Sequence, residues 1–496
     1  MSATAEAGRT MIGDHSTGTA TAAIAGPILY ARGGDGERHD LAALLVLPDG
    51  IGAPELLPDS GDPARPIVLA TCFGRTVWRY DFSLPADRDS AYRLGGERFT
   101  VASPAASDRR IVYVSCNGQE TGDLDRLDTE RDAMWERLAA EHRRTPFALM
   151  LQGGDQLYAD DVLLAHPSVE RWAAAPRDAR GDIGFEPEAD AAVRRFYFER
   201  YLGNFGRTAM RTVAAEVPSV MMWDDHDIID GWGSHPGALL DSPVGRGLFA
   251  AARDMFLLFQ VAGSDAALPA TVPDRSGATL GLAIGFPGLT ILAPDLRSER
   301  RPDQVMGSAG WSFLESALAA TPARNRVLMM SSVPALGPRL SWVEAVADML
   351  PVRNKYEDDM RDQWQSRVHR DEWIRFLSLL AARQEAADQP LTLVSGEIHL
   401  ATRGEMRLTD GSQLHQLVAS GISHPAPSRS YPMLLGFLAR FGQSPLPGQP
   451  IRLHPLPGQR WTYVAERNYL VLSFEEEALQ AEWELERGGR TPPLAL

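Results

Sequence analysis

The sequence has little cysteine and no excess of basic residues. Two cysteines occur among 496 residues, so the chain lacks the disulfide framework of small secreted domains. The 49 lysine and arginine residues are outnumbered by 65 aspartate and glutamate residues, which gives a formal net charge of −16. A chain this acidic repels duplex nucleic acid, so we expect no nucleic acid as a structural partner. A small phosphorylated substrate is still compatible with this net charge, because a binding site can be locally positive inside an acidic protein.

Long hydrophobic runs are also absent. No window approaches the roughly 18 consecutive apolar residues of a membrane helix, so the sequence predicts no transmembrane segment. The stretch from Met1 to Ala25 lacks a basic start, a twin-arginine pair and a continuous apolar region. We therefore identify no signal peptide and expect a cytoplasmic protein. The sequence does not indicate the oligomeric state.

Composition divides the chain into four predicted segments. Residues 1–24 are small and polar, and we expect a flexible arm. Residues 25–107 contain short β-like segments between turn residues, which is typical of a β-sandwich domain. Residues 108–428 alternate apolar runs with amphipathic stretches, as an α/β domain does. Residues 429–496 are first rich in Pro and Gly and then strand-like, and we expect a lid or wrap over the main domain.

Several elements can be predicted inside these segments. The strands expected in the sandwich are residues 27–30, 41–47, 66–71, 75–82 and 97–101. In the main domain, one helix should begin near Thr129, and others should cover residues 190–201, 311–320 and 371–384. The last segment contains a short apolar helix candidate at residues 433–441 and two final strands, 469–474 and 478–485.

Four apolar strands of the main domain are each followed at once by side chains that can bind a metal ion. Residues 111–114 lead into Ser115-Cys116-Asn117, residues 147–151 into Gly153-Gly154-Asp155-Gln156-Leu157-Tyr158, residues 217–223 into Asp224-Asp225-His226-Asp227, and residues 391–394 into Ser395-Gly396-Glu397-Ile398-His399. The carboxyl ends of the strands in an open α/β sheet form one edge, where ligands bind. We therefore expect these side chains to converge.

The converging groups are those of a metal centre. Thiolate and phenolate favour a redox-type or trivalent ion such as iron, whereas carboxylates suit magnesium, calcium or manganese. Burying so many acids without a cation costs several kcal/mol each. Taken singly, the aspartates could be turn formers or helix caps, Cys116 a small buried hydrophobe, and Tyr158 a core-edge aromatic. Their recurrence at four strand ends predicts a metal site made of Cys116, Asp155, Tyr158, Asp224, Asp225, Glu397 and His399.

At these residues the sequence resembles the PhoD-like alkaline phosphatases, a branch of the metallophosphatase superfamily. Secondary matches are Asp295-Leu296-Arg297-Ser298-Glu299-Arg300 and Asp362-Gln363-Trp364, and the motifs span about residues 110 to 425 in the family's order. The resemblance implies an α/β fold with a four-layer αββα metallophosphatase core behind an N-terminal β-sandwich domain.

The resemblance also implies a centre of two or more metal ions, Fe³⁺ with Ca²⁺, with Mn²⁺ or Zn²⁺ as alternatives. Cys116, Asp155 and Tyr158 would hold the ferric ion, and Asp155 would bridge to a second ion bound by Asp225. Glu397 and His399 would close the site. The chain departs from the family at Glu397, where Asp is usual, and in the residues after the triplet, Asp227-Ile228-Ile229-Asp230. Both departures affect the metals and the substrate that we expect.

We predict a metal-dependent phosphoester hydrolase, a phosphomonoesterase and/or phosphodiesterase, in which a metal-bound hydroxide attacks phosphorus without a covalent phosphoenzyme. His226 would donate a proton to the leaving group. Asn117 and Arg297 are candidates for holding a phosphoryl oxygen, although Arg297 could instead pair with Asp295. His424 lies near the same edge of the sheet and is a candidate for contacting one of the metal-ligating side chains. The alternative is an inactive or regulatory module that serves as a binding or scaffold protein, and a metal analysis would separate the two.

Overall fold

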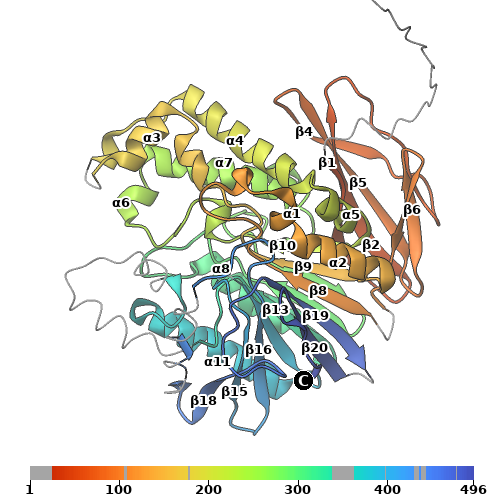
Figure 1. The fold of residues 1–496 in the computed structure, drawn as a ribbon, viewed down its shortest axis with the longest axis vertical. Helices are drawn as coiled ribbons and strands as arrows, with labels where there is room; N and C mark the ends of the chain where they lie inside the picture. The colour runs from red at the N-terminus through yellow and green to blue at the C-terminus, as the bar shows by residue number, and fades with distance from the viewer. Residues whose placement is uncertain are drawn as a thin grey trace, which may run out of the picture.

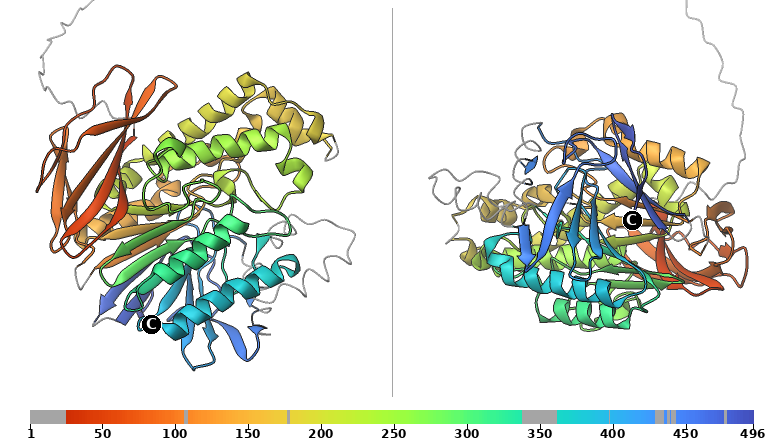
Figure 2. Two further views of the ribbon diagram at one scale, coloured as in Figure 1. Left: turned by 180° about the vertical axis from the view of Figure 1, so that it is seen from behind. Right: turned by 90° about the horizontal axis from the view of Figure 1, so that it is seen from below.

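The computed structural model describes residues 25–105, 109–176, 179–337, 362–396, 398–428, 435–436, 439, 443–475 and 478–496. The predicted arm at residues 1–24, the predicted ligand Glu397 and most of the 433–441 helix candidate lie outside the described residues. The described residues form two large sheets, with helices on the outer face of each (Figure 1, Figure 2). Among them, no helix combines the length and the apolar composition that crossing a bilayer requires.

The first sheet has the strand order β21-β20-β19-β8-β9-β10-β1-β2-β5-β4, and β22 also pairs with β20. In chain order its strands are β1 (Ala25–Gly34), β2 (Arg38–Pro48), β4 (Pro66–Cys72), β5 (Arg75–Pro85), β8 (Arg110–Val114), β9 (Leu149–Gly153), β10 (Ser219–Met222), β19 (Asn468–Glu475), β20 (Ala478–Leu485), β21 (Gly489–Arg490) and β22 (Leu494–Ala495). Strands β8, β9 and β10 are parallel, so their carboxyl ends lie at one edge.

The second sheet has the order β11-β12-β13-β14-β16-β15-β18-β17. Its strands are β11 (Leu282–Phe286), β12 (Leu289–Ala293), β13 (Arg326–Ser331), β14 (Leu391–Ser395), β15 (Thr402–Arg407), β16 (Gln413–Val418), β17 (Gln443–Leu446) and β18 (Gln449–His454). Strands β12, β13, β14 and β16 are parallel neighbours. This sheet therefore also has a central parallel part whose strand ends form a single edge.

The main helices of the first sheet are α2 (Ala133–Arg144), α4 (Pro187–Phe205), α5 (Thr208–Glu216) and α7 (Pro243–Phe259), and those of the second are α8 (Ser308–Ala320) and α11 (Arg370–Ala386). The short helices α1 (Asp128–Arg131), α3 (Pro167–Ala174) and α6 (Gly237–Leu240) lie in the connections. Helix α7 begins where the sequence offers a cap: the Ser242 hydroxyl accepts a hydrogen bond from the Gly245 amide at 3.0 Å, and Pro243 occupies the first turn.

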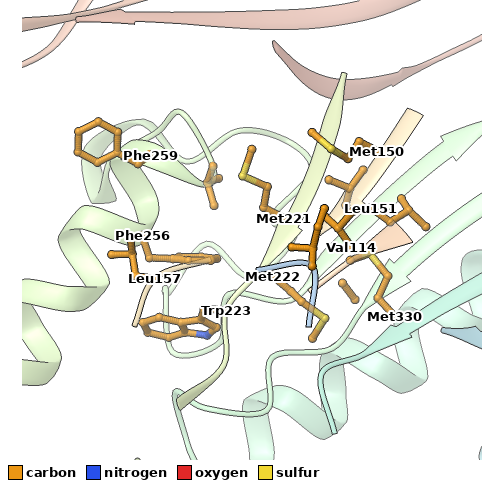
Figure 3. Close-up of a cluster of buried hydrophobic side chains, with 14 of the residues drawn as sticks. Val114, Met150, Leu151, Leu157, Met221, Met222, Trp223, Phe256, Phe259 and Met330 are labelled. Carbon is orange, nitrogen blue, oxygen red and sulfur yellow. The ribbon is translucent and has the colours of Figure 1, made fainter. Parts of the chain in front are cut away.

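Alternating side chains of the strands build the core between the layers. On β13, Leu328 and Met330 belong to the core between the sheets, while Val327 and Met329 pack with the side chains of α8 and α11. Figure 3 shows Met330 approaching Val114 and Met222, which come from the first sheet. The predicted order of helix, sheet, sheet and helix is thus confirmed.

The N-terminal region has the two packed layers of a sandwich, but one of them continues the first large sheet. Strands β3 (Leu56–Pro58), β6 (Ser90–Leu94) and β7 (Glu97–Val101) form a small sheet that shares a separate core with β2 and β5. Strand β1 pairs in parallel with β10 through Tyr30 and Ser219. The first sheet therefore crosses the predicted boundary at residues 107 and 108.

The end of the chain contributes strands to both sheets, where we had expected a lid or wrap. Strand β19 pairs with β8, with Leu470 opposite Tyr113, and β18 pairs with β15. Residues 468–472 are buried on both faces of β19, which is the pattern of a strand inside a layered domain. The predicted ranges 469–474 and 478–485 match β19 and β20 closely.

Candidate metal centre

The predicted ligands that the structure describes converge where the strand ends of the two sheets meet. Cys116 follows β8, Asp155 follows β9, Asp225 follows β10 and His399 follows β14. Cys116, Asp155 and His399 have φ angles of 54°, 53° and 54°, and they are three of the five non-glycine residues with positive φ in the described part of the chain. Such a backbone costs on the order of 1–3 kcal/mol per residue and clusters at functional sites.

Glycine allows two strand ends to approach each other closely. Gly154 has a φ angle of 105°, and a Cβ atom placed on it would lie 2.8 Å from Cβ of Asp224. A side chain at this position would be strained by the backbone and would push Asp224 away. The Gly153-Gly154-Asp155 segment thus brings the carboxyl ends of β9 and β10 together.

Three overlapping groups of side chains could each hold a metal ion. Their members are Cys116, Asp155 and His399; Asp155, Asp224 and Asp225; and Asp225, His226 and Asp230, with the potential ligand atoms of each group within 4.8 Å of one another. Asp155 belongs to the first two groups and Asp225 to the last two. A carboxylate that is shared in this way can bridge two cations.

Two buried carboxylate oxygens in these groups have no hydrogen-bond partner among the described residues. They are Oδ1 of Asp155 and Oδ2 of Asp224, and both residues are 1% exposed. The other oxygen of Asp155 lies 3.5 Å from Sγ of Cys116 and 3.4 Å from the Tyr158 hydroxyl. A buried acceptor without a donor is costly, and a cation would satisfy both oxygens. The residues present therefore fit a metal centre.

Burial and mutual repulsion disfavour the ionised forms of these groups in the absence of a cation. Burial, then Asp225 and Asp224, raise the pKa of Asp155 well above its ordinary value. Burial raises the pKa of Asp224 to about 6, even though Arg297 lowers it. Burial and the neighbouring Asp155 raise the pKa of the Cys116 thiol. A bound cation would reverse this balance and favour thiolate and carboxylate.

Tyr158 contacts two members of the first ligand group, Asp155 and His399. The Tyr158 hydroxyl lies 2.9 Å from Nε2 of His399. The sequence analysis missed Ser420, which contacts two members of this group. Its hydroxyl accepts a hydrogen bond from the His399 amide at 2.9 Å and lies 3.1 Å from Sγ of Cys116. Glu397 lies outside the described residues, so its assignment as a ligand stays a prediction.

His226 is held by an aspartate that the sequence analysis also missed. Its Nδ1 lies 2.9 Å from Oδ2 of Asp160, and its ring stacks on Tyr158 with centroids 4.4 Å apart. Oδ1 of Asp160 accepts a hydrogen bond from the Asp230 amide at 2.7 Å. Burial alone would lower the pKa of His226, but Asp160 and Asp225 raise it well above its ordinary value. The sequence offered one signal for this role of Asp160, namely an acidic residue only two positions after Tyr158.

Arg297 is placed differently from our prediction of a phosphate contact. Its side chain is 0% exposed, and its Nη1 and Nη2 donate to the two carboxylate oxygens of Asp362 at 2.9 and 2.6 Å. Its Nε donates to Asp224, and Nη2 lies 3.4 Å from Oδ1 of Asp225. The alternative pair with Asp295 is not formed by the guanidinium either. Arg297 orients carboxylates of the second ligand group.

Asn117 is likewise bound to protein groups. Its Oδ1 accepts hydrogen bonds from Trp135 Nε1 and Arg207 Nη2, both at 2.7 Å, and from the Ser423 hydroxyl at 3.0 Å. Its Nδ2 faces the sulfur of Met210 at 3.7 Å. These bonds hold the loop after β8, and they give no support to the predicted contact with a phosphoryl oxygen.

Comparisons with known proteins bear on the family and the fold of this chain. The sequence model of the family described as PhoD-related phosphatase matches residues 91–358, more than half of the 496-residue chain. A solved structure of PhoD superposes with a TM-score of 0.58 over 95% of this chain and 88% of that one; at 12% identity it shows the fold alone. An uncharacterized protein of Saccharomyces cerevisiae, YGR266W, is 24% identical over 404 residues, covering 67% of this chain. The match spans only 56% of the yeast protein.

Proposed function

Because the chain belongs to the family of PhoD-related phosphatases, we propose that it hydrolyses phosphoesters with a centre of at least two metal ions. The matched segment contains five of the proposed ligands, whereas Glu397 and His399 lie beyond it; the five are Cys116, Asp155, Tyr158, Asp224 and Asp225. The observation that carries the proposal is a pair of buried carboxylate oxygens, in two ligand groups that share Asp155, for which the described part of the chain offers no donor.

The two ligand groups offer different donor atoms, and each set of donor atoms therefore suits a different metal ion. Cys116, Tyr158 and His399 offer sulfur, phenol oxygen and imidazole nitrogen beside Asp155, a set that favours Fe³⁺. Asp155, Asp224 and Asp225 offer carboxylate oxygen alone, which suits Ca²⁺ or Mn²⁺; Zn²⁺ is a further candidate. We retain Glu397 as a proposed ligand on its sequence motif. When bound, such ions acidify a water molecule and neutralise charge at phosphorus.

The residues of the chain would supply the proton and the orientation. Asp160 holds Nδ1 of His226, so Nε2 of the same ring can donate a proton to the leaving-group oxygen. Arg297 fixes the directions of Asp224 and Asp225 from behind the second group. General acid catalysis of this kind contributes about 10²–10⁴-fold.

The test is to measure metal content and activity on the same purified protein. We expect about two metal ions per chain, iron among them, and hydrolysis of p-nitrophenyl phosphate or bis-p-nitrophenyl phosphate. The ratio of the two rates assigns the enzyme to monoesters or diesters. A metal-free protein that hydrolyses neither compound would contradict the proposal and favour the inactive or scaffold alternative.

A further inference from the structure

His424 lies against the proposed metal ligand His399, although it belongs to none of the three ligand groups. The two imidazole rings are nearly parallel, with an angle of 8° between their planes and 3.4 Å between their centroids. The ring of Tyr158 is 5.4 Å away. One face of the His399 ring is thus covered by His424, while Nε2 of His399 lies next to the Tyr158 hydroxyl.

The backbone around His424 is attached to the loop that carries Cys116. The amides of Ser423 and His424 both donate to the carbonyl oxygen of Cys116, at 3.3 and 3.1 Å. The Ile422 amide donates to the carbonyl oxygen of Ser115 at 3.0 Å. His424 therefore has a fixed position relative to the first ligand group, even though its loop follows β16 and the Cys116 loop follows β8.

Glu120 and Pro425 fix the ring of His424 at its two nitrogens. Nε2 of His424 lies 3.2 Å from Oε2 of Glu120, and Nδ1 lies 2.8 Å from the carbonyl oxygen of Pro425. Glu120 comes from the same loop as Cys116. A second link joins the two loops, because Arg126 Nη2 donates to the Ser423 carbonyl oxygen at 2.7 Å. The plane of the His424 ring is thus set before it meets His399.

From these contacts we propose that Glu120 and His424 are positioning residues that hold the imidazole of His399 in the orientation that binds the metal. This inference rests on the proposed function, because it needs a metal at His399. His399 has a strained backbone with a φ angle of 54°, a conformation that persists only where the surrounding contacts maintain it. Partners behind metal ligands typically contribute about 10- to 100-fold in metal affinity.

The test compares iron affinity by competition with a chelator of known affinity, using full-length protein. We expect His424→Ala to weaken iron binding by about 10- to 100-fold, because the His399 ring loses the surface that fixes its plane. His424→Phe keeps a flat ring at this place but loses the contact with Glu120, so we expect its iron affinity to lie between those of the wild type and His424→Ala. Glu120→Ala removes the same contact, and we expect an iron affinity similar to that of His424→Phe.

A matched control removes a similar pair elsewhere. His454 on β18 pairs with Glu405 on β15, with Nε2 and Oε1 2.9 Å apart, and neither belongs to a ligand group of the described residues. We expect His454→Ala to leave iron affinity unchanged. We expect the metal-free His424→Ala and His454→Ala proteins to have similar free energies of unfolding. A purely structural role of His424 would instead lower the free energy of unfolding of His424→Ala without changing its iron affinity.

The outcomes separate the inference from the proposed function. Wild-type protein that binds iron and hydrolyses phosphoesters, with His424→Ala binding iron equally well, would overturn the inference and leave the function standing. Equal losses in His424→Phe and His424→Ala would also overturn it, because stacking would then not be the cause. A wild-type protein without metal and without activity would overturn both.

Discussion

The Arg297–Asp362 pair and the Asp155–Asp224–Asp225 group are equally buried, and they meet at Asp224, but their charges are satisfied in opposite ways. All three guanidinium nitrogens of Arg297 have acceptors, and Asp362 also accepts a hydrogen bond from the Ser234 hydroxyl at 2.6 Å. In the carboxylate group, Asp155 and Asp224 each keep one oxygen to which no residue in the described ranges donates. The first region is a complete scaffold. In the second, Arg297 reaches Asp224 and Asp225, but no described residue donates to Oδ1 of Asp155 or Oδ2 of Asp224.

The largest effect should come from the carboxylate that two ligand groups share. We expect Asp155→Asn to lower kcat/KM by at least about 10⁴-fold, about 5.5 kcal/mol, because both metals lose a ligand. In the presence of EDTA, the same variant should be more stable than the wild type by about 1–2 kcal/mol, because it removes a buried carboxylate whose Oδ1 has no donor among the described residues. Chemical denaturation with and without EDTA measures this. A loss of stability in EDTA would show that Oδ1 of Asp155 has a partner within the protein.

Asp362→Ala should have the opposite signature. It leaves the guanidinium of Arg297 buried without its bidentate partner, and we expect a loss of about 3–5 kcal/mol in the free energy of unfolding. The loss should be the same with and without EDTA, because Asp362 belongs to no ligand group of the described residues. If Asp362→Ala were destabilised only in the metal-loaded protein, the division into scaffold and site would be incorrect.

Asp160→Asn should weaken proton donation by His226 and leave the metal content unchanged. We expect kcat to fall by about 10- to 100-fold with unchanged metal content, because His226 loses the carboxylate at Nδ1. The decrease should be larger for an alkyl phosphate than for p-nitrophenyl phosphate, whose leaving group needs little protonation. The neighbouring Asp161, which pairs with Arg200 at 3.3 Å, provides the control Asp161→Asn with near-normal kcat. Equal effects of the two variants would contradict the role of Asp160.

Cys116→Ala should have the smallest and most selective effect. We expect iron binding to weaken by about 10-fold, with calcium or manganese content nearly unchanged, because the thiol belongs only to the first ligand group. Cys72→Ala is the matched control, since Cys72 is only partly buried on β4. Full iron content in Cys116→Ala would remove this residue from the proposed ligand set.

The sequence predicted the parts of this site that depend on strand ends. Cys116, Asp155, Asp225 and His399 each follow a short apolar strand directly, and the parallel arrangement then brings them together. The layered α/β class was also predictable, because apolar strands alternate with amphipathic helices along residues 108–428, whereas the four-layer order was expected only from the resemblance to the PhoD-like phosphatases. These features are local, and a local pattern can be read from the chain.

The remaining features depend on contacts between distant residues. Arg297 was expected to face phosphate because its residue type suits that task, but its partner Asp362 is 65 positions away. The sequence shows the type of the Asn117 side chain and not its direction, and Trp135 and Arg207 turn it into the protein. Similarly, nothing local distinguishes a final strand that wraps over a domain from β19, which pairs with β8 inside the first sheet.

The most direct test of the central claim is the metal content of wild-type protein beside that of Asp155→Asn, measured by elemental analysis together with a visible spectrum. We predict about two metal ions per chain in the wild type, with absorption from a ferric phenolate at Tyr158, and loss of both metals and colour in the variant. An active wild-type protein without metal, or a variant that keeps the full metal content, would contradict the account.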